Sequence, residues 1–114
     1  MIKTSYRYET KARGGLLLIT LYGEIDHHSA VSLREDLDKL IVSERPTRFV
    51  LDLSHIEFMD SAGLGLLMGR LRLVRDLGGT MALHAPNPRV LKILQLAGME
   101  RFFEIDDLPK GERR

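Results

Sequence analysis

The feature that most constrains the fold is the regular alternation of strand-like and helix-like segments along the chain. Residues 2–10 and 16–23 have the alternating apolar pattern of β-strands, and the Gly14-Gly15 pair between them predicts a hairpin. Further strands are predicted at residues 47–54, 80–85 and 101–105, each after a helical segment. Because crossover helices join strands in parallel, this order predicts a single α/β domain with a mixed sheet and crossover α-helices.

Three helices are predicted where apolar residues recur every three to four positions. The first covers residues 26–44, and either Asp26 or Ser29 can cap its N-terminus. The second begins after Asp60 and the third after Asn87, and both of these helices end at glycines. Each predicted helix therefore lies between two predicted strands.

The composition narrows the classes of function. The 114 residues are enough for one hydrophobic core, and 44% apolar with 29% charged residues is ordinary for a globular domain. A net charge of +1 gives no field that attracts nucleic acid or a membrane surface, so neither is expected as a partner. The absence of cysteine excludes disulfides and thiol catalysis. No segment is apolar enough for a signal peptide or a membrane span, so a cytoplasmic protein is expected.

The stretch FMDSAGLGLLMGR, residues 58–70, contains glycines where helix propensity disfavours them. Gly65 and Gly69 lie inside the second predicted helix, where a glycine costs about 1 kcal/mol relative to alanine. Small residues leave the helix backbone uncovered by side chains. Either this protein's own sheet or the surface of another protein is therefore expected to pack against it. Ser61 lies at the N-terminus of the predicted helix. It either caps the first turn, as Asp60 can also do, or is a functional group. The residues alone leave both choices open.

The segment before this helix adds an argument for a partner. It follows the predicted strand 47–54, and its apolar residues Ile56, Phe58 and Met59 are expected to be exposed in a loop. Exposed apolar side chains beside small residues are typical of a surface that binds another protein.

No familiar catalytic or metal-binding pattern is present. The four histidines lack the spacing of a metal site, since His27 and His28 are adjacent and the others stand alone. The glycines fit neither a Walker loop nor a dinucleotide fingerprint. Ser61 lacks the preceding glycine that a nucleophile elbow requires, because Met59 occupies that position. No catalytic residue, metal or cofactor is therefore expected.

Three segments together resemble the anti-sigma factor antagonists, which have the STAS fold. These segments are GEIDHHSA at 23–30, FMDSAGLGLLMGR at 58–70 and GGTMALHAPNPRVLKILQLAGM at 78–99. The similarity extends over residues 10 to 105 and is closest to the sporulation type, the anti-sigma F factor antagonists. It implies a STAS domain over residues 3–108 and a flexible C-terminal tail over residues 109–114.

The resemblance implies a regulatory protein and not an enzyme. Such antagonists bind an anti-sigma factor that is also a serine kinase, and binding releases the sigma factor so that transcription starts. The kinase carries the ATP or ADP, so the antagonist needs no cofactor, and a serine phosphatase reverses the modification. The phosphorylated serine directly follows the Asp of the motif. Here that serine is Ser61 after Asp60, and Ala62 stands where many relatives have a second serine.

The partner surface implied by the resemblance surrounds Ser61. The resemblance also assigns Asp26 to this surface, and the clustering of turns at one edge of a sheet agrees with that assignment. The expected partner-binding residues are Asp26, His27, Ile56, Met59, Asp60, Ser61, Ala62, Gly63, Gly65 and Arg70. The free protein is expected to be a monomer.

Two other classes of function remain compatible with the sequence. One is a STAS scaffold in a larger signalling assembly. The other is a module that senses a nucleotide or small molecule through the helix N-terminus. The motifs do not identify the sigma factor, because sporulation, stress and general antagonists share them, although the DHH segment favours sporulation.

Overall fold

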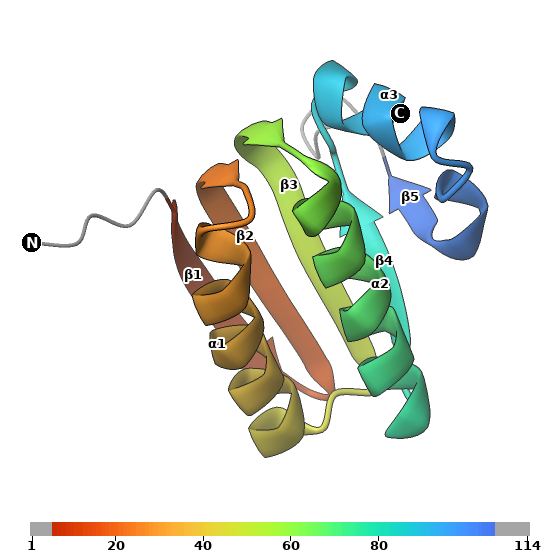
Figure 1. Ribbon diagram of the computed structural model, residues 1–114. Coiled ribbons are helices and arrows are strands. Elements are labelled where there is room, and N and C mark those ends of the chain that lie inside the picture. Colours follow the sequence, from red (N-terminus) through yellow and green to blue (C-terminus); the bar gives the residue numbers. More distant parts are fainter. Residues whose placement is uncertain (1–5, 107–114) are drawn as a thin grey trace, which may run out of the picture.

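The computed structural model describes residues 6–106, and the predicted order of strands and helices is confirmed (Figure 1). The elements are β1 (Tyr6–Arg13), β2 (Leu16–Ile25), α1 (Ser29–Glu44), β3 (Arg48–Met59), α2 (Ser61–Asp76), β4 (Thr80–His84), α3 (Pro88–Leu96) and β5 (Glu104–Asp106). A 3₁₀ turn at Glu100–Phe102 occupies the start of the last predicted strand. The predicted tail, residues 109–114, lies outside the described residues.

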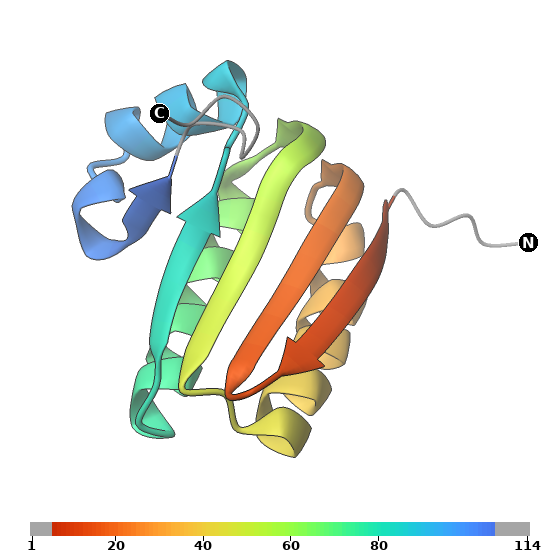
Figure 2. The same cartoon turned by 180° about the vertical axis from the view of Figure 1, so that it is seen from behind.

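One mixed sheet organises the domain, with its strands in the order β1-β2-β3-β4-β5. Only the β1–β2 hairpin is antiparallel, and β2 to β5 run parallel. Helices α1 and α2 lie side by side on one face of the sheet (Figure 1). The view from behind shows β1 to β4 without a covering helix on the other face (Figure 2). Within residues 6–106 no helix is long and apolar enough to cross a membrane.

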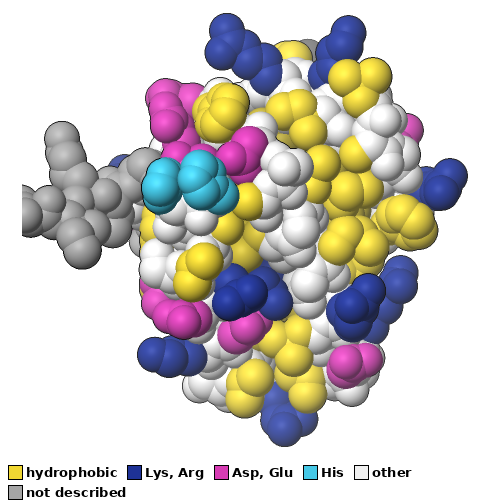
Figure 3. Space-filling view, viewed as in Figure 1, with side chains coloured by type: hydrophobic (Ala, Val, Ile, Leu, Met, Phe, Trp, Pro, Cys, Tyr) yellow, Lys and Arg dark blue, Asp and Glu magenta, His cyan; other side chains and the backbone are white. Residues whose placement is uncertain are grey.

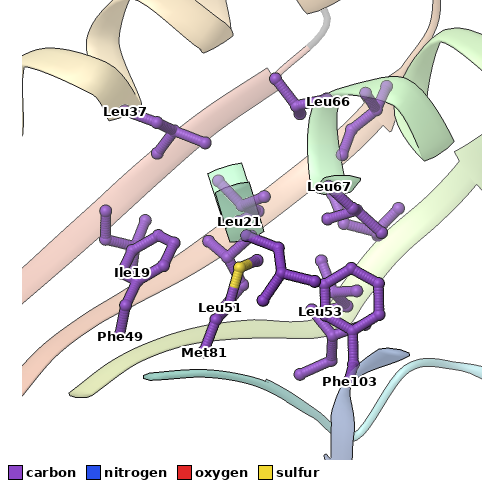
Figure 4. Close-up of a cluster of buried hydrophobic side chains, with 14 of the residues drawn as sticks. Ile19, Leu21, Leu37, Phe49, Leu51, Leu53, Leu66, Leu67, Met81 and Phe103 are labelled. Carbon is purple, nitrogen blue, oxygen red and sulfur yellow. The ribbon is translucent and has the colours of Figure 1, made fainter. Parts of the chain in front are cut away.

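The core lies between this sheet and the two helices. Alternate residues of β2 and β3 face the helices, since successive side chains of a strand point to opposite sides. The residues buried there include Leu17, Ile19 and Leu21 of β2, Phe49, Leu51 and Leu53 of β3, Leu33, Leu37 and Ile41 of α1, and Leu66, Leu67 and Leu71 of α2 (Figure 4). Each buried aliphatic side chain contributes about 1.5–3 kcal/mol. These facing stripes fix both helices to the sheet.

Strand β3 continues to Met59, which overturns the expectation of an exposed loop before α2. Ile56 and Met59 are 0% and 1% exposed, so they belong to the core, whereas Phe58 is 49% exposed. The pairing with β2 shifts twice along this stretch, and at each shift β3 has one residue more than β2. Such bulges break the alternation of apolar and polar residues. The end of β3 therefore lacks the sequence pattern of a strand.

The side chain of Asp26 caps the start of α1, although the N-cap position belongs to His28, whose own side chain makes no capping hydrogen bond. Oδ1 of Asp26 accepts hydrogen bonds from the N–H groups of His28 and Ser29, each at 2.9 Å. Ser29, the other candidate, is buried, and its Oγ accepts from the N–H of Asp26 at 3.0 Å. The hydrogen bond from the Ser29 amide is the main cause that lowers the pKa of Asp26 below its usual 3.8.

The glycines of α2 have different surroundings. A Cβ atom at Gly63 would lie 2.9 Å from Sδ of Met59 and 3.3 Å from Cγ2 of Ile25, so only glycine allows α2 to approach the sheet this closely. Nothing lies within 4 Å of a Cβ atom placed at Gly65 or Gly69. These two glycines therefore face open space and not this protein's own sheet.

Gly63→Ala and Gly65→Ala are expected to change stability in opposite directions. Alanine at Gly63 overpacks the contact of α2 with Met59 and Ile25, and it lowers the free energy of unfolding by about 1–3 kcal/mol. Alanine at Gly65 meets no neighbour and raises the free energy of unfolding by about 0.5–1 kcal/mol, because alanine favours the helix. Urea unfolding of both variants measures this difference. Changes of the same sign at both positions would contradict this packing of α2.

The cap of α1 is expected to make stability depend on pH in acid. Because folding lowers the pKa of Asp26, the unfolded chain binds this proton more readily than the folded protein. The cap therefore stabilises the fold above the usual pKa of 3.8, and this contribution is lost as the pH falls through the lower folded value. Urea unfolding of wild type and Asp26→Ala across this range should show a difference that shrinks in acid. A constant difference would rule out a charged cap, and Asp26→Asn is the neutral control.

Candidate functional site

The carboxyl ends of β2, β3 and β4 meet at one edge of the sheet, where α1, α2 and α3 begin (Figure 1). Two hydrogen bonds join the turns at this edge. The N–H of Asp60 donates to the carbonyl of Ile25 at 3.1 Å, and Nδ2 of Asn87 donates to the carbonyl of Ile56. Ile25 also pairs with Met59 across the two strands. The turns that carry Asp26 and Ser61 are thus neighbours.

Asp60, and not Ser61, caps α2. Oδ1 of Asp60 accepts a hydrogen bond from the N–H of Ala62 at 2.8 Å. Ser61 is the first residue of the helix and is exposed, and within residues 6–106 its hydroxyl has no hydrogen-bond partner. The Ser61 hydroxyl is therefore free of a structural role and accessible to another molecule.

The edge around Ser61 is acidic and is flanked by two histidines. Nδ1 of His27 lies 3.8 Å from Oδ2 of Asp60, and the rings of His27 and His28 lie 4.0 Å apart between their centroids. Figure 3 shows the histidine side chains against acidic ones at this end of the molecule. A negative group added at Ser61 would meet the carboxylates of Asp60 and Asp26, while the amides and the dipole of the first turn of α2 would favour it.

The predicted partner-binding residues differ in accessibility. Those that are exposed or half-buried around the acidic edge and the start of α2 are Asp26, His27, Asp60, Ser61, Ala62 and Gly65. The predicted exposure of Ile56 and Met59 is wrong, because the bulged end of β3 turns both side chains into the core. Gly63 is buried against them. These three residues lie in the core beneath the site, and their predicted role in partner binding stays a prediction.

Arg70 lies between α1 and α2. Its Nε is 2.7 Å from Oδ1 of Asp38, and its side chain is 8% exposed against 37% for Asp38. The atoms are not aligned for a hydrogen bond, so neither Nε nor Nη1 has a hydrogen-bond partner among the described residues. Burial lowers the pKa of Arg70, and Asp38 opposes that shift. Arg70 is thus a buried ion-pair partner of Asp38, and its predicted contact with a partner protein stays a prediction.

A groove of about 400 Å³ runs between α1 and α2 on their outer side. It is lined by His27, Ala30, Val31, Arg34, Ala62, Gly65, Leu66, Gly69 and Arg70. The contribution of α1 to the groove could not be predicted, because Ala30, Val31 and Arg34 resemble the ordinary outer face of an amphipathic helix. The signal that pointed to the groove is the pair of glycines inside α2, which leaves one wall without side chains.

The remaining histidines have partners elsewhere in the fold. The ring of His55 stacks on the ring of Tyr22, with 4.7 Å between their centroids. The guanidinium group of Arg7 lies over the Tyr22 ring. Nδ1 of His84 lies 3.0 Å from Oδ2 of Asp106. Among residues 6–106 no three potential metal ligands come together.

Known proteins similar to this chain include several antagonists. The family model of the STAS domain matches residues 7–109. An anti-sigma F factor antagonist of Paenibacillus polymyxa is 36% identical over 99 residues, which cover 87% of this chain and 85% of the relative. An anti-sigma-B factor antagonist of Bacillus subtilis (strain 168) is 30% identical over 93 residues, which cover 82% of this chain and 84% of the relative.

Solved structures share the fold over nearly the whole chain. The anti-sigma factor antagonist SpoIIAA in its unphosphorylated form has a TM-score of 0.76 at 27% identity and covers 93% of this chain and 91% of its own. The Bacillus cell fate determinant SpoIIAA in the phosphorylated form has a TM-score of 0.69 at 26% identity, with 93% and 95% covered. With this fold and these relatives, the chain belongs to the STAS family, and within it to the anti-sigma factor antagonists.

Proposed function

We propose that this chain binds an anti-sigma factor, releases the sigma factor held by it, and is switched off by phosphorylation of Ser61. The observation that carries the proposal is the free, exposed hydroxyl of Ser61 at the N-terminus of α2, where Asp60 already serves as the cap. The relatives support it, since they are named antagonists of anti-sigma factors, and SpoIIAA has both an unphosphorylated and a phosphorylated form.

The chemistry requires only a hydroxyl from this chain. The proposed partner is an anti-sigma factor with serine kinase activity, which holds ATP. A bond forms between Oγ of Ser61 and the γ-phosphorus, the bond to the ADP oxygen breaks, and the hydroxyl proton passes to a base of the kinase. A serine phosphatase would restore the hydroxyl by hydrolysis. We place this exchange in the cytoplasm, with no nucleic acid or membrane as a direct partner.

Charge explains how the phosphate would separate the two proteins. A phosphoserine carries about −1.5 to −2 charges at pH 7. At the first residue of α2 the free amides and the helix dipole tolerate that charge, so the antagonist stays folded. In an interface the same dianion would be buried beside Asp60 and Asp26, and an unpaired buried charge is strongly unfavourable. The switch therefore acts at the contact and needs no rearrangement of the fold.

Ser61→Ala is expected to bind the anti-sigma factor and to resist phosphorylation. The antagonist is incubated with the anti-sigma factor of the same organism and ATP, and intact mass is measured. Wild type should gain one phosphate and Ser61→Ala none, because the acceptor hydroxyl is missing.

Ser43→Ala is the matched control, since Ser43 is another exposed serine and lies at the far end of α1. It should gain one phosphate as wild type does. Stoichiometric phosphorylation of Ser61→Ala would show that the acceptor is another residue. An unchanged mass of wild type with a kinase that is active on another substrate would favour a scaffold or sensor module.

Ser61→Asp is expected to stay folded and to bind the anti-sigma factor at least about tenfold more weakly than wild type. Aspartate brings a negative charge to the first turn of α2, which the helix accepts and an acidic interface does not. Ser61→Asn has nearly the same size without the charge and should keep the affinity of wild type. Calorimetric titration gives the affinities and circular dichroism the fold. Equal losses for both variants would indicate that size, and not charge, weakens the contact.

A further inference from the structure

We propose that the groove between α1 and α2 receives an acidic side chain of the anti-sigma factor, as a second contact beyond the edge that carries Ser61. This inference rests on the proposed function. It is supported by the shape of the groove, the charge of its lining and the buried Nη1 of Arg70, which has no hydrogen-bond partner among the described residues.

The shape of the groove depends on residues that the fold itself does not require. Gly65 and Gly69 face open space, and both weaken the helix that contains them. Ala30 and Ala62 continue this bare lining on both helices. The volume of about 400 Å³ falls within the range of sites that accept a ligand group. Val31, which is 52% exposed, offers an apolar wall to a methylene stem.

The lining has one sign of charge. Arg34, Arg70 and, when protonated, His27 are the ionisable residues of the groove, and none of its described lining residues is acidic. Arg34 has no ion pair among residues 6–106 and is exposed. Burial is the main cause of the lowered pKa of Arg70, and Arg34 adds to it, so the two cations are near enough to repel. An anion placed between them would relieve this repulsion.

Arg70 supplies the evidence that a hydrogen-bond acceptor belongs in the groove. The residue is only 7% exposed and lines the groove. Its Nε lies 2.7 Å from Oδ1 of Asp38, whereas its Nη1 has no hydrogen-bond partner within the described part of the chain. Buried donors without acceptors are rare in folded proteins, because they lose their bonds to water. A carboxylate matches a guanidinium group in both charge and geometry.

The occupant is best described as a carboxylate on a flexible stem, as in glutamate. Its methylenes would lie along Gly69 and Val31, and its carboxylate would reach Arg34 and Arg70. Gly69 lies two helical turns beyond Ser61, about 12 Å along the axis of α2. The groove contact can therefore be tested separately from phosphorylation of Ser61.

The test uses the anti-sigma factor that phosphorylates Ser61 and compares variants by calorimetric titration. Gly69→Leu fills the groove and Arg34→Glu reverses its charge, so each should raise the dissociation constant by about tenfold or more. Gly69→Ala should raise it less, although this variant is expected to melt at a higher temperature than wild type. Lys39→Glu makes the same charge reversal on α1 outside the groove and should leave the affinity unchanged.

Charge exchange identifies the occupant. Replacing acidic residues of the anti-sigma factor by lysine, one at a time, should give one variant that binds Arg34→Glu more tightly than it binds wild type. If Gly69→Leu and Arg34→Glu bind like wild type and Ser61 is still phosphorylated, the groove inference is wrong and the proposed function stands. If wild type itself is neither bound nor phosphorylated, the proposed function fails first.

A small-molecule site is the competing outcome. The isolated protein is titrated with glutarate, a free dicarboxylate, and backbone amide resonances are followed by NMR. The proposal predicts no saturable shift at Gly65 and Gly69, because a free acid lacks the neighbouring contacts of a protein. Saturable binding that Gly69→Leu abolishes, with unchanged affinity for the anti-sigma factor, would overturn the proposal.

Discussion

The parallel pairing of Ile25 with Met59, closed by the hydrogen bond from Asp60 to the carbonyl of Ile25, is the constraint on which the rest of the structure depends. It ends two adjacent strands at the same level, so that α1 and α2 start side by side and cross the same face of the sheet. The acidic edge exists because both helix starts carry a capping carboxylate. The groove exists because the two helices stay neighbours while small residues line the space between them.

Local signals predicted the fold well, and contacts between distant residues explain what they missed. The hairpin, the three helices and the caps at Asp26 and Asn87 follow from residues only a few positions apart. The end of β3 could not be predicted from nearby residues, because its bulges are defined by the pairing with β2. The burial of Arg70 could not be predicted, because its partner, Asp38, lies on another helix. Similarly, the groove needs both helices at once, and the sequence shows only the glycines of one.

The geometry also shows that Asp60, and not Ser61, is the cap of α2. Asp60 has the extended backbone of an N-cap residue, and its carboxylate reaches the amide of Ala62. Two polar residues that looked equivalent in sequence thus have separate roles. The family resemblance nominated Ser61, and the hydrogen bonds explain why that serine is available. The acidic edge and the cationic groove also lie on one pair of helices, so a partner that binds as we propose has to match both charges in the correct register.

The separation of cap and acceptor has a consequence for timing. Helix α2 keeps its first hydrogen bond whatever is attached to the neighbouring hydroxyl, because Asp60 holds the amide of Ala62 independently. Adding or removing a phosphate then requires no unwinding of the helix and no slow refolding step. Under the proposed function, the rate of alternation between the two states would then be set by the kinase and the phosphatase that act on Ser61. The fold of the antagonist would add no conformational delay.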